Sequence, residues 1–264
     1  MLNRILTTVL ALTAVIITLT SATIADAQIV EDGLVSYWTF DEADIDGDTA
    51  RDVWGDNDGT IMGDPKSVPG RVGEAFEFDG TVDYIAVPVS PSLNMAASSY
   101  TIVVWALVDN SVAYASERIL VEYGTWVSGT YQLTSMSDNH WKTNFHGRSS
   151  NQGSECLLDW TDSEWHHLVG VFDNDANFMR TYFDGAECDT TVENNAPFDV
   201  DLALYIASRG GTNLFSKVTL DEIAIYNRAL SDAEVKQNMD AADFAAVSLA
   251  DNLATTWGEI KVSR

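Results

Sequence analysis

The sequence predicts an all-β protein: a two-sheet antiparallel β-sandwich with a short C-terminal helical segment. From residue 33 to about residue 226, short runs rich in β-branched and aromatic residues are separated by Gly, Asp, Asn and Ser, which is the spacing of short sandwich strands. Dipeptides such as Asp79-Gly80 and Asp184-Gly185 fall between these runs, and they tolerate the positive φ that tight turns require.

Apolar residues alternate along several of the runs, most clearly over residues 100–108, so one face of each strand is expected to meet the core. The strands that we expect, in chain order, span residues 33–40, 75–78, 84–87, 100–108, 118–123, 131–136, 141–146, 166–173, 178–183, 202–207 and 217–226.

One helix should follow the strands, because Ser231 and Glu234 form a capping box in which each side chain satisfies a free amide of the first turn. We expect this helix to reach about Met239. Residues 28–240 then make one domain of a length common for all-β sandwiches. Residues 241–264 form either a second helix against the sandwich or a loosely attached tail.

Residues 1–27 have the layout of a secretory signal peptide. Arg4 precedes an apolar run from Ile5 to Leu19, and Ala25-Asp26-Ala27 provides the small-residue cleavage site. An uncleaved membrane anchor is the alternative, but the run is shorter than the roughly twenty apolar residues that a span needs. We expect cleavage after Ala27, export to the extracellular space or periplasm, and no membrane span in the mature chain.

The chain is strongly acidic, with 40 Asp and Glu against 14 Lys and Arg and a net charge of −26. Nucleic acids and anionic membrane surfaces are therefore disfavoured as partners. The carboxylates either keep an exported protein hydrated or supply oxygen ligands for a hard cation such as calcium. Composition alone does not separate these two uses.

Two cysteines occur, Cys156 and Cys188. An even number in an exported protein indicates one disulfide, and a buried pair of free thiols is the alternative. A bridge that closes a loop of about thirty residues would stabilise the fold by some 3–4 kcal/mol in the chain-entropy estimate.

Several segments, taken in order, resemble the LamG-like jelly-roll family of concanavalin A-like domains. The resembling segments are residues 33–42, 73–80, 165–169 with 182–185, and 220–231. Together they cover about residues 33–240, and the resemblance implies the jelly-roll form of the β-sandwich. Val82 departs from the family pattern, which usually has a second Asp at this position.

A calcium site is the first candidate functional site. Related concanavalin A-like domains often hold such an ion, and the resemblance places Asp41, the carbonyl of Gly80 and Asp221 as its ligands. Mixed carboxylate and carbonyl oxygens suit calcium. The alternative is that Asp41 caps a turn and Asp221 lies at a solvated strand end.

A sugar-binding surface is the second candidate. It requires aromatic rings that stack on a pyranose and polar groups that bind its hydroxyls. Residues 123–148 have this composition, and the candidates are Trp126, Tyr131, Trp141, His146 and Arg148. Core packing explains Tyr131 and Trp141 equally well.

Catalysis is the weaker hypothesis. Laminarinase-like hydrolases of this fold carry two Glu on one strand as E-x-D-x-x-E, and the chain has no such motif. His166 and His167 are adjacent and should point to opposite faces of a strand, so we expect structural roles for both.

The function expected is therefore that of a secreted, non-catalytic recognition module, which binds carbohydrate or glycosylated surfaces and holds a structural calcium ion. One alternative is a protein-binding adhesion or matrix module. The other is a glycoside hydrolase or lyase with atypical catalytic carboxylates. The sequence does not predict the ligand's identity or the oligomeric state.

Overall fold

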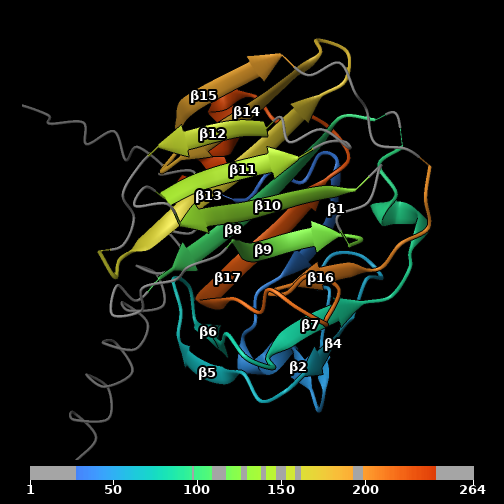
Figure 1. Ribbon diagram of the computed structural model, residues 1–264, viewed down its shortest axis with the longest axis vertical. Coiled ribbons are helices and arrows are strands. Elements are labelled where there is room, and N and C mark those ends of the chain that lie inside the picture. The colour runs from blue at the N-terminus through green and yellow to red at the C-terminus, as the bar shows by residue number, and fades with distance from the viewer. Residues whose placement is uncertain are drawn as a thin grey trace, which may run out of the picture.

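The computed structural model describes residues 28–96, 98–108, 117–125, 130–137, 141–146, 153–157, 162–192 and 199–241, with the backbone alone for residues 136, 137 and 141–146. These residues form two sheets that pack face to face (Figure 1), and the neighbouring strands are antiparallel. The predicted all-β two-sheet sandwich is confirmed.

The first sheet has eight strands in the described chain, and β1 pairs with β17 beside its main path. Its spatial order is β15 (Ala186–Val192), β14 (Phe178–Phe183), β13 (Trp165–Asp173), β8 (Tyr100–Leu107), β17 (Lys217–Tyr226), β6 (Glu74–Asp79) and β5 (Lys66–Pro69), with β1 at Leu34–Trp38.

The second sheet has nine strands in the described chain and faces the viewer in Figure 1. Its order is β12 (Gly153–Leu157), β11 (Trp141–His146), β10 (Tyr131–Ser137), β9 (Arg118–Tyr123), β16 (Leu204–Ile206), β7 (Tyr84–Val87), β4 (Gly59–Met62), β3 (Thr49–Ala50) and β2 (Ile45–Asp46). Two short 3-10 helices, Glu42–Asp44 and Pro91–Leu93, lie in loops.

The main hydrophobic core lies between the two sheets. Both sheets contribute fully buried side chains to it, among them Trp38, Phe78, Tyr100, Leu133 and Leu204. Burial of such side chains is the dominant stabilising term for a sandwich. The alternation that the sequence shows along the strands follows from this core.

A second apolar cluster covers the outer face of the eight-stranded sheet. Leu230 and Val235 pack there beside Tyr226 of β17, and residues 232–241 are helical. The backbone N–H of Ser231 donates to the Glu234 carboxylate at 2.8 Å, so the predicted capping box is confirmed. Within the described chain no helix is long and apolar enough to cross a bilayer.

Residues 28–30 run along the same helix. The Val30 N–H donates to Asn238 Oδ1 at 2.8 Å, and Gln237 Nε2 donates to the Gln28 carbonyl at 2.8 Å. Both ends of the described chain therefore lie over the outer face of the eight-stranded sheet.

The predicted disulfide between Cys156 and Cys188 is confirmed. It joins β12 to β15, which are edge strands of different sheets. The Thr181 hydroxyl donates to the Ser154 carbonyl at 2.9 Å beside it. The bridge thus links the two layers of the sandwich along one open side.

The two adjacent histidines point to different surroundings, as a strand requires. His166 lies between Asp184, 2.9 Å from Nδ1, and Asp162, 3.0 Å from Nε2. Burial alone would lower the His166 pKa, but the hydrogen bonds that the imidazole makes to these aspartates outweigh it and raise the pKa above 6.5. His167 is fully buried against Trp105.

Candidate functional site

A row of residues crosses the outer face of the nine-stranded sheet. Ala86 pairs with Tyr205, Tyr205 with Glu122, Glu122 with Gln132, and Gln132 with His146. The residues directly before and after Ala86, Tyr205, Glu122 and Gln132 in their strands lie in the main core. Successive side chains of a strand point to opposite faces, so these four side chains point outward. Those neighbours are Ile85, Val87, Leu204, Ile206, Val121, Tyr123, Tyr131 and Leu133.

Arg209 contacts two side chains of this row, Glu122 and Gln132. Its Nε donates to Glu122 Oε1 at 3.0 Å, and one terminal nitrogen donates to Gln132 Oε1 at 3.2 Å and contacts Glu117 Oε2 at 3.1 Å. Glu122 is fully buried, while the Arg209 and Glu117 side chains are 14% and 15% exposed. A guanidinium held by two carboxylates and an amide is fixed in place.

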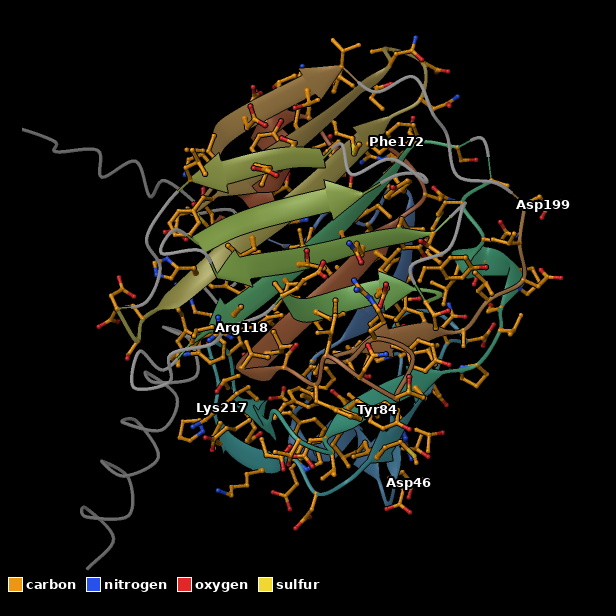
Figure 2. All side chains as sticks on the ribbon, in the orientation of Figure 1. Asp46, Tyr84, Arg118, Phe172, Asp199 and Lys217 are labelled. Atoms are coloured by element: carbon orange, nitrogen blue, oxygen red, sulfur yellow. A yellow bond between two sulfur atoms is a disulfide. The ribbon has the colours of Figure 1, made fainter. Side chains whose placement is uncertain are left out.

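Aromatic rings flank the ionic group. Tyr84 of β7 lies with its ring centroid 6.5 Å from Tyr205 and 5.9 Å from Phe215, and all three rings are partly exposed. Figure 2 shows the position of Tyr84 on the sheet. Gly211 adopts a φ of +65°, and a Cβ there would lie 2.6 Å from the Tyr84 ring. Glycine is therefore needed where this loop meets the ring.

This surface carries groups that are able to contact a sugar. Partly exposed rings can stack on the apolar face of a pyranose, and the partly exposed Glu117 carboxylate and Arg209 guanidinium can bind hydroxyls. The sequence reasoning missed Arg209, Glu122 and Tyr205. These residues come from separate strands and loops, so they give no local motif.

The structure places the predicted ligand-binding residues in different surroundings. Tyr131 is fully buried, stacks on Tyr123 at 4.9 Å and donates its hydroxyl to the Leu93 carbonyl. It is therefore a core residue, and the prediction of a surface role was wrong because the side chain points between the sheets.

The other candidates lie partly or wholly outside the described residues. The backbones of Trp141 and His146 lie on β11, where His146 pairs with Gln132 of the polar row. Trp126 and Arg148 lie outside the described residues. Their roles in ligand binding stay predictions.

The structure brings two of the three predicted calcium ligands to one loop, residues 70–74. Asp221 Oδ2 accepts the N–H groups of Arg71 and Val72 at 2.7 and 3.1 Å, and Asp41 Oδ1 accepts the N–H of Glu74 at 2.8 Å. Burial raises the pKa of Asp221 to about 8, and the neighbouring Asp41 carboxylate adds to the rise.

Gly80 lies elsewhere. It follows β6 at the end opposite Glu74, and a Cβ on it would lie 2.9 Å from Lys217. In the part of the chain that the structure describes, no three His, Cys, Asp or Glu side chains converge as metal ligands. Asp41 and Asp221 are the residues here whose oxygens fit a hard cation.

The fold and the polar outer face together define a lectin-like β-sandwich. The chain belongs to the concanavalin A-like lectin/glucanases superfamily, whose family model matches residues 79–236. The predicted resemblance is thus confirmed. No curated protein matches the chain.

Solved structures share the fold. The binding domain of Paraclostridial Mosquitocidal Protein 1 has a TM-score of 0.61 at 18% identity, over 79% of this chain and 52% of that one. The binding domain of botulinum neurotoxin DC in complex with SialylT has a TM-score of 0.63 at 14% identity, over 80% and 52%.

A Trypanosoma rangeli sialidase has a TM-score of 0.60 at 18% identity, over 83% of this chain and 34% of that one. The chain therefore spans about half of each toxin domain and a third of the sialidase. At these identities the likeness shows the fold, which is shared by binding domains and enzymes.

Proposed function

We propose that this protein is a secreted, non-catalytic recognition module that binds carbohydrate or glycosylated surfaces through the outer face of its nine-stranded sheet. The observation that carries the proposal is the fixed Arg209 group with Glu122 and Gln132, flanked by the rings of Tyr84 and Tyr205. A neurotoxin binding domain of the same fold was solved with a sialylated ligand, and this supports a sugar as the ligand.

Binding would follow from the preorganised geometry. The partly exposed Glu117 carboxylate and Arg209 guanidinium bind sugar hydroxyls, while buried Glu122 holds Arg209 in place, and the Tyr205 ring stacks on the C–H face of a pyranose. Because Arg209 already fixes the polar groups, little side-chain entropy is lost when a ligand binds.

The same contacts support a non-catalytic role. Glu117 and Glu122 both contact the one guanidinium of Arg209. A glycosidase needs a carboxyl that reaches the leaving group of a bound sugar, whereas Glu122 is fully buried and both carboxylates already contact Arg209.

A glycan array with the purified protein tests the proposal. We expect binding to a defined sugar, and we expect Tyr205→Ala to weaken it by about tenfold, equivalent to roughly 1.4 kcal/mol. Val192→Ala is the control, because Val192 is 69% exposed on β15 of the other sheet. If the array shows no sugar, or if Tyr205→Ala binds as the wild type does, the proposal fails. Sugar-insensitive capture of a protein would favour an adhesion role, and release of reducing sugar an enzyme.

Export after cleavage at Ala27 is part of the proposal. The Cys156–Cys188 disulfide supports it, since such bridges persist in oxidising compartments. Mass spectrometry of the natural protein should give Gln28 as the first residue. An intact N-terminus at Met1 would contradict it.

We also propose that calcium stabilises the loop of residues 70–74 through Asp41 and Asp221. Burial and the nearby Asp41 carboxylate raise the pKa of Asp221, and a cation at this place would relieve both effects. Calcium should raise the melting temperature of the wild type, and Asp221→Asn should remove that rise. Equal melting temperatures in calcium and in chelator would contradict the proposal.

A further inference from the structure

The charges around Arg209 decide which sugars the outer face of the nine-stranded sheet can accept. Nitrogens of Arg209 lie 3.1 Å from a Glu117 oxygen and 3.0 Å from a Glu122 oxygen, so one positive and two negative charges give this group a net charge of −1. Glu122 is fully buried and the other two side chains are mostly buried. Water therefore screens the excess negative charge only in part.

The contacts of Arg209 also occupy the donors that an acidic group needs. A guanidinium holds a carboxylate through two parallel N–H bonds, and either edge that can do so uses a hydrogen of Nη2. In Arg209 this nitrogen donates to Gln132 Oε1 at 3.2 Å and contacts Glu117 Oε2, while Nε donates to both oxygens of Glu122 at 3.0 and 3.3 Å. An acidic ligand group would have to displace one of these partners.

The loop that carries Arg209 is closed by its own backbone. The Arg209 N–H donates to the Asn213 carbonyl at 3.0 Å, and the N–H groups of Thr212 and Asn213 donate to the Arg209 carbonyl at 3.3 and 3.4 Å. Arg209 is thus held through its backbone as well as its side chain. Turning the guanidinium toward a new anion would break contacts that are already made.

Glu117 is the partly exposed carboxylate of this group, and a carboxylate only accepts hydrogen bonds. Its Oε1 lies 3.4 Å from Gln132 Nε2, and its Oε2 contacts Arg209. A sugar hydroxyl has a hydrogen that it can donate to Glu117. A ligand carboxylate or sulfate has none at neutral pH, so it would place two negative groups side by side, which is strongly unfavourable at an interface.

Other carboxylates act in the same direction. Asp199 and Asp201 flank Val200, whose carbonyl accepts the hydroxyl of Tyr123, the residue after Glu122 in β9. Burial raises the pKa of Tyr123, and the Asp201 and Asp199 carboxylates add to the rise. Figure 2 shows Asp199 at the rim of the molecule. Together with the net charge of −26, these groups repel an anion that approaches the face.

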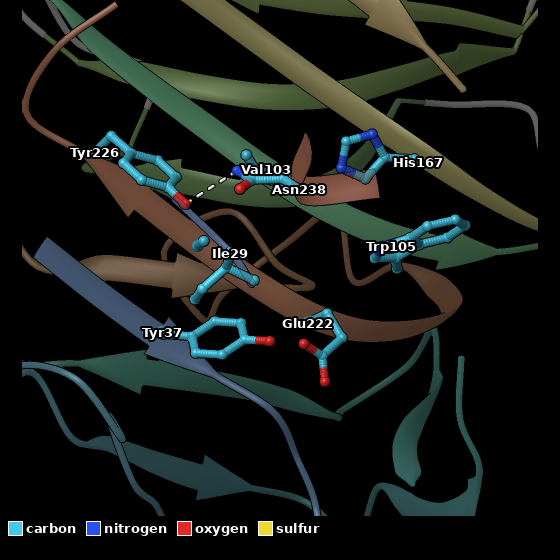
Figure 3. A pocket seen from close by; sticks show the side chains of 9 residues that line it. Ile29, Tyr37, Val103, Trp105, His167, Glu222, Tyr226 and Asn238 are labelled. Atoms are coloured by element: carbon cyan, nitrogen blue, oxygen red, sulfur yellow. Dashed lines mark hydrogen bonds between the residues drawn. The ribbon is translucent and has the colours of Figure 1, made fainter. Parts of the chain in front are cut away.

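A hollow on the outer face of the eight-stranded sheet is no alternative place for a sugar (Figure 3). Its lining includes Tyr37, Trp105, His167 and Glu222, the last with a φ of +50°. The volume of the hollow is about 20 Å³, which is room for about one water molecule. Selection among sugars therefore falls to the face that carries Arg209.

We infer that this face accepts uncharged glycans and rejects acidic ones, and that Glu117 is the residue that determines this selectivity. The inference rests on the proposed carbohydrate-binding function and narrows it to one class of ligand. Hydroxyls of an uncharged sugar donate to Glu117, whereas a sialic acid, a uronic acid or a sulfated sugar meets a carboxylate and an arginine that is already paired.

The test is a glycan array in which each uncharged oligosaccharide stands beside its sialylated and sulfated forms. The protein produced from the full-length chain is applied at pH 7 in about 0.1 M salt. Each acidic form should bind at least about tenfold more weakly than its uncharged counterpart, a difference of about 1.4 kcal/mol. The difference should shrink in 1 M salt, where the Debye length falls from about 10 Å to about 3 Å.

Two variants separate the local charge from the charge of the whole chain. Glu117→Gln removes one negative charge beside Arg209 and keeps an acceptor oxygen, so it should remove most of the difference between acidic and uncharged forms. Asp240→Asn is the matched control, since it changes the net charge equally but lies on the helix of residues 232–241, over the opposite face. It should leave the difference unchanged. Each variant's melting temperature checks that it is folded.

The possible failures are distinct. Equal or tighter binding of the acidic forms would overturn the inference, and so would an unchanged difference in Glu117→Gln or an equal reduction in Asp240→Asn. In all three cases the bound sugars would leave the proposed function standing. An array without any bound sugar would refute the proposed function itself, and the inference with it.

Discussion

The ionic group at Arg209 makes the sharpest prediction about stability. Replacing Arg209 by Met removes the cation but keeps most of the side-chain volume. Glu122 is then left fully buried without the guanidinium that now lies 3.0 Å away. Removing one partner of a buried ion pair costs about 3–5 kcal/mol, because an uncompensated charge stays in the interior.

The loss should appear in urea denaturation as a lower midpoint with an unchanged slope. At about 2–4 °C per kcal/mol for a domain of this size, the melting temperature should fall by about 6–20 °C. The double variant Arg209→Met/Glu122→Gln should recover much of the loss, since the fully buried carboxylate is gone and Glu117, which also loses the guanidinium, is 15% exposed to water. A loss below about 1 kcal/mol in Arg209→Met, or a double variant no more stable than the single one, would refute this reasoning.

Three further predictions concern other parts of the fold. Replacing both Cys156 and Cys188 by Ala should lower the free energy of unfolding by about 3–4 kcal/mol, measured in urea; reduction of the wild type should have the same effect, and no loss would mean that the bridge is energetically neutral. The wild type has a stabilisation from charged His166 that is full below pH 6.5 and is lost as the pH rises through the raised pKa of His166. His166→Gln should remove it, so the difference in unfolding free energy between the two proteins should shrink from pH 5.5 to pH 8.5. A constant difference would contradict the role of the two aspartates beside His166. Gly211→Ala should destabilise the loop over Tyr84 by about 1 kcal/mol or more and weaken sugar binding in parallel, whereas unchanged melting and affinity would show that the loop adapts.

The strands with long apolar runs could be predicted from the sequence. Residues 118–123 and 217–226 match β9 and β17 at both ends, because continuous apolar and β-branched residues mark strands that are buried. The edge strand β15, Ala186–Val192, was missed. Its side chains are mostly polar and exposed, so no hydrophobic pattern marks it.

The candidate site was harder to predict for a different reason. Glu122 and Arg209 are 87 residues apart in the chain, and the pairing of β16 with β9 brings the loop that carries Arg209 beside Glu122. Tyr131 was assigned to the surface wrongly for another reason. The sequence around an aromatic residue in a strand is the same whether its ring faces the core or a ligand. The positive φ at Glu222 also has no sequence signal, because glycine is the usual residue there.

The position of the chain ends affects how the protein would work on a surface. Residues 28–30 and the helix of residues 232–241 leave the sandwich over the eight-stranded sheet. The described chain therefore begins and ends on the face opposite the Arg209 row. A surface or partner that holds the protein by the face carrying residues 28–30 and the helix would leave the Arg209 face open to a large ligand.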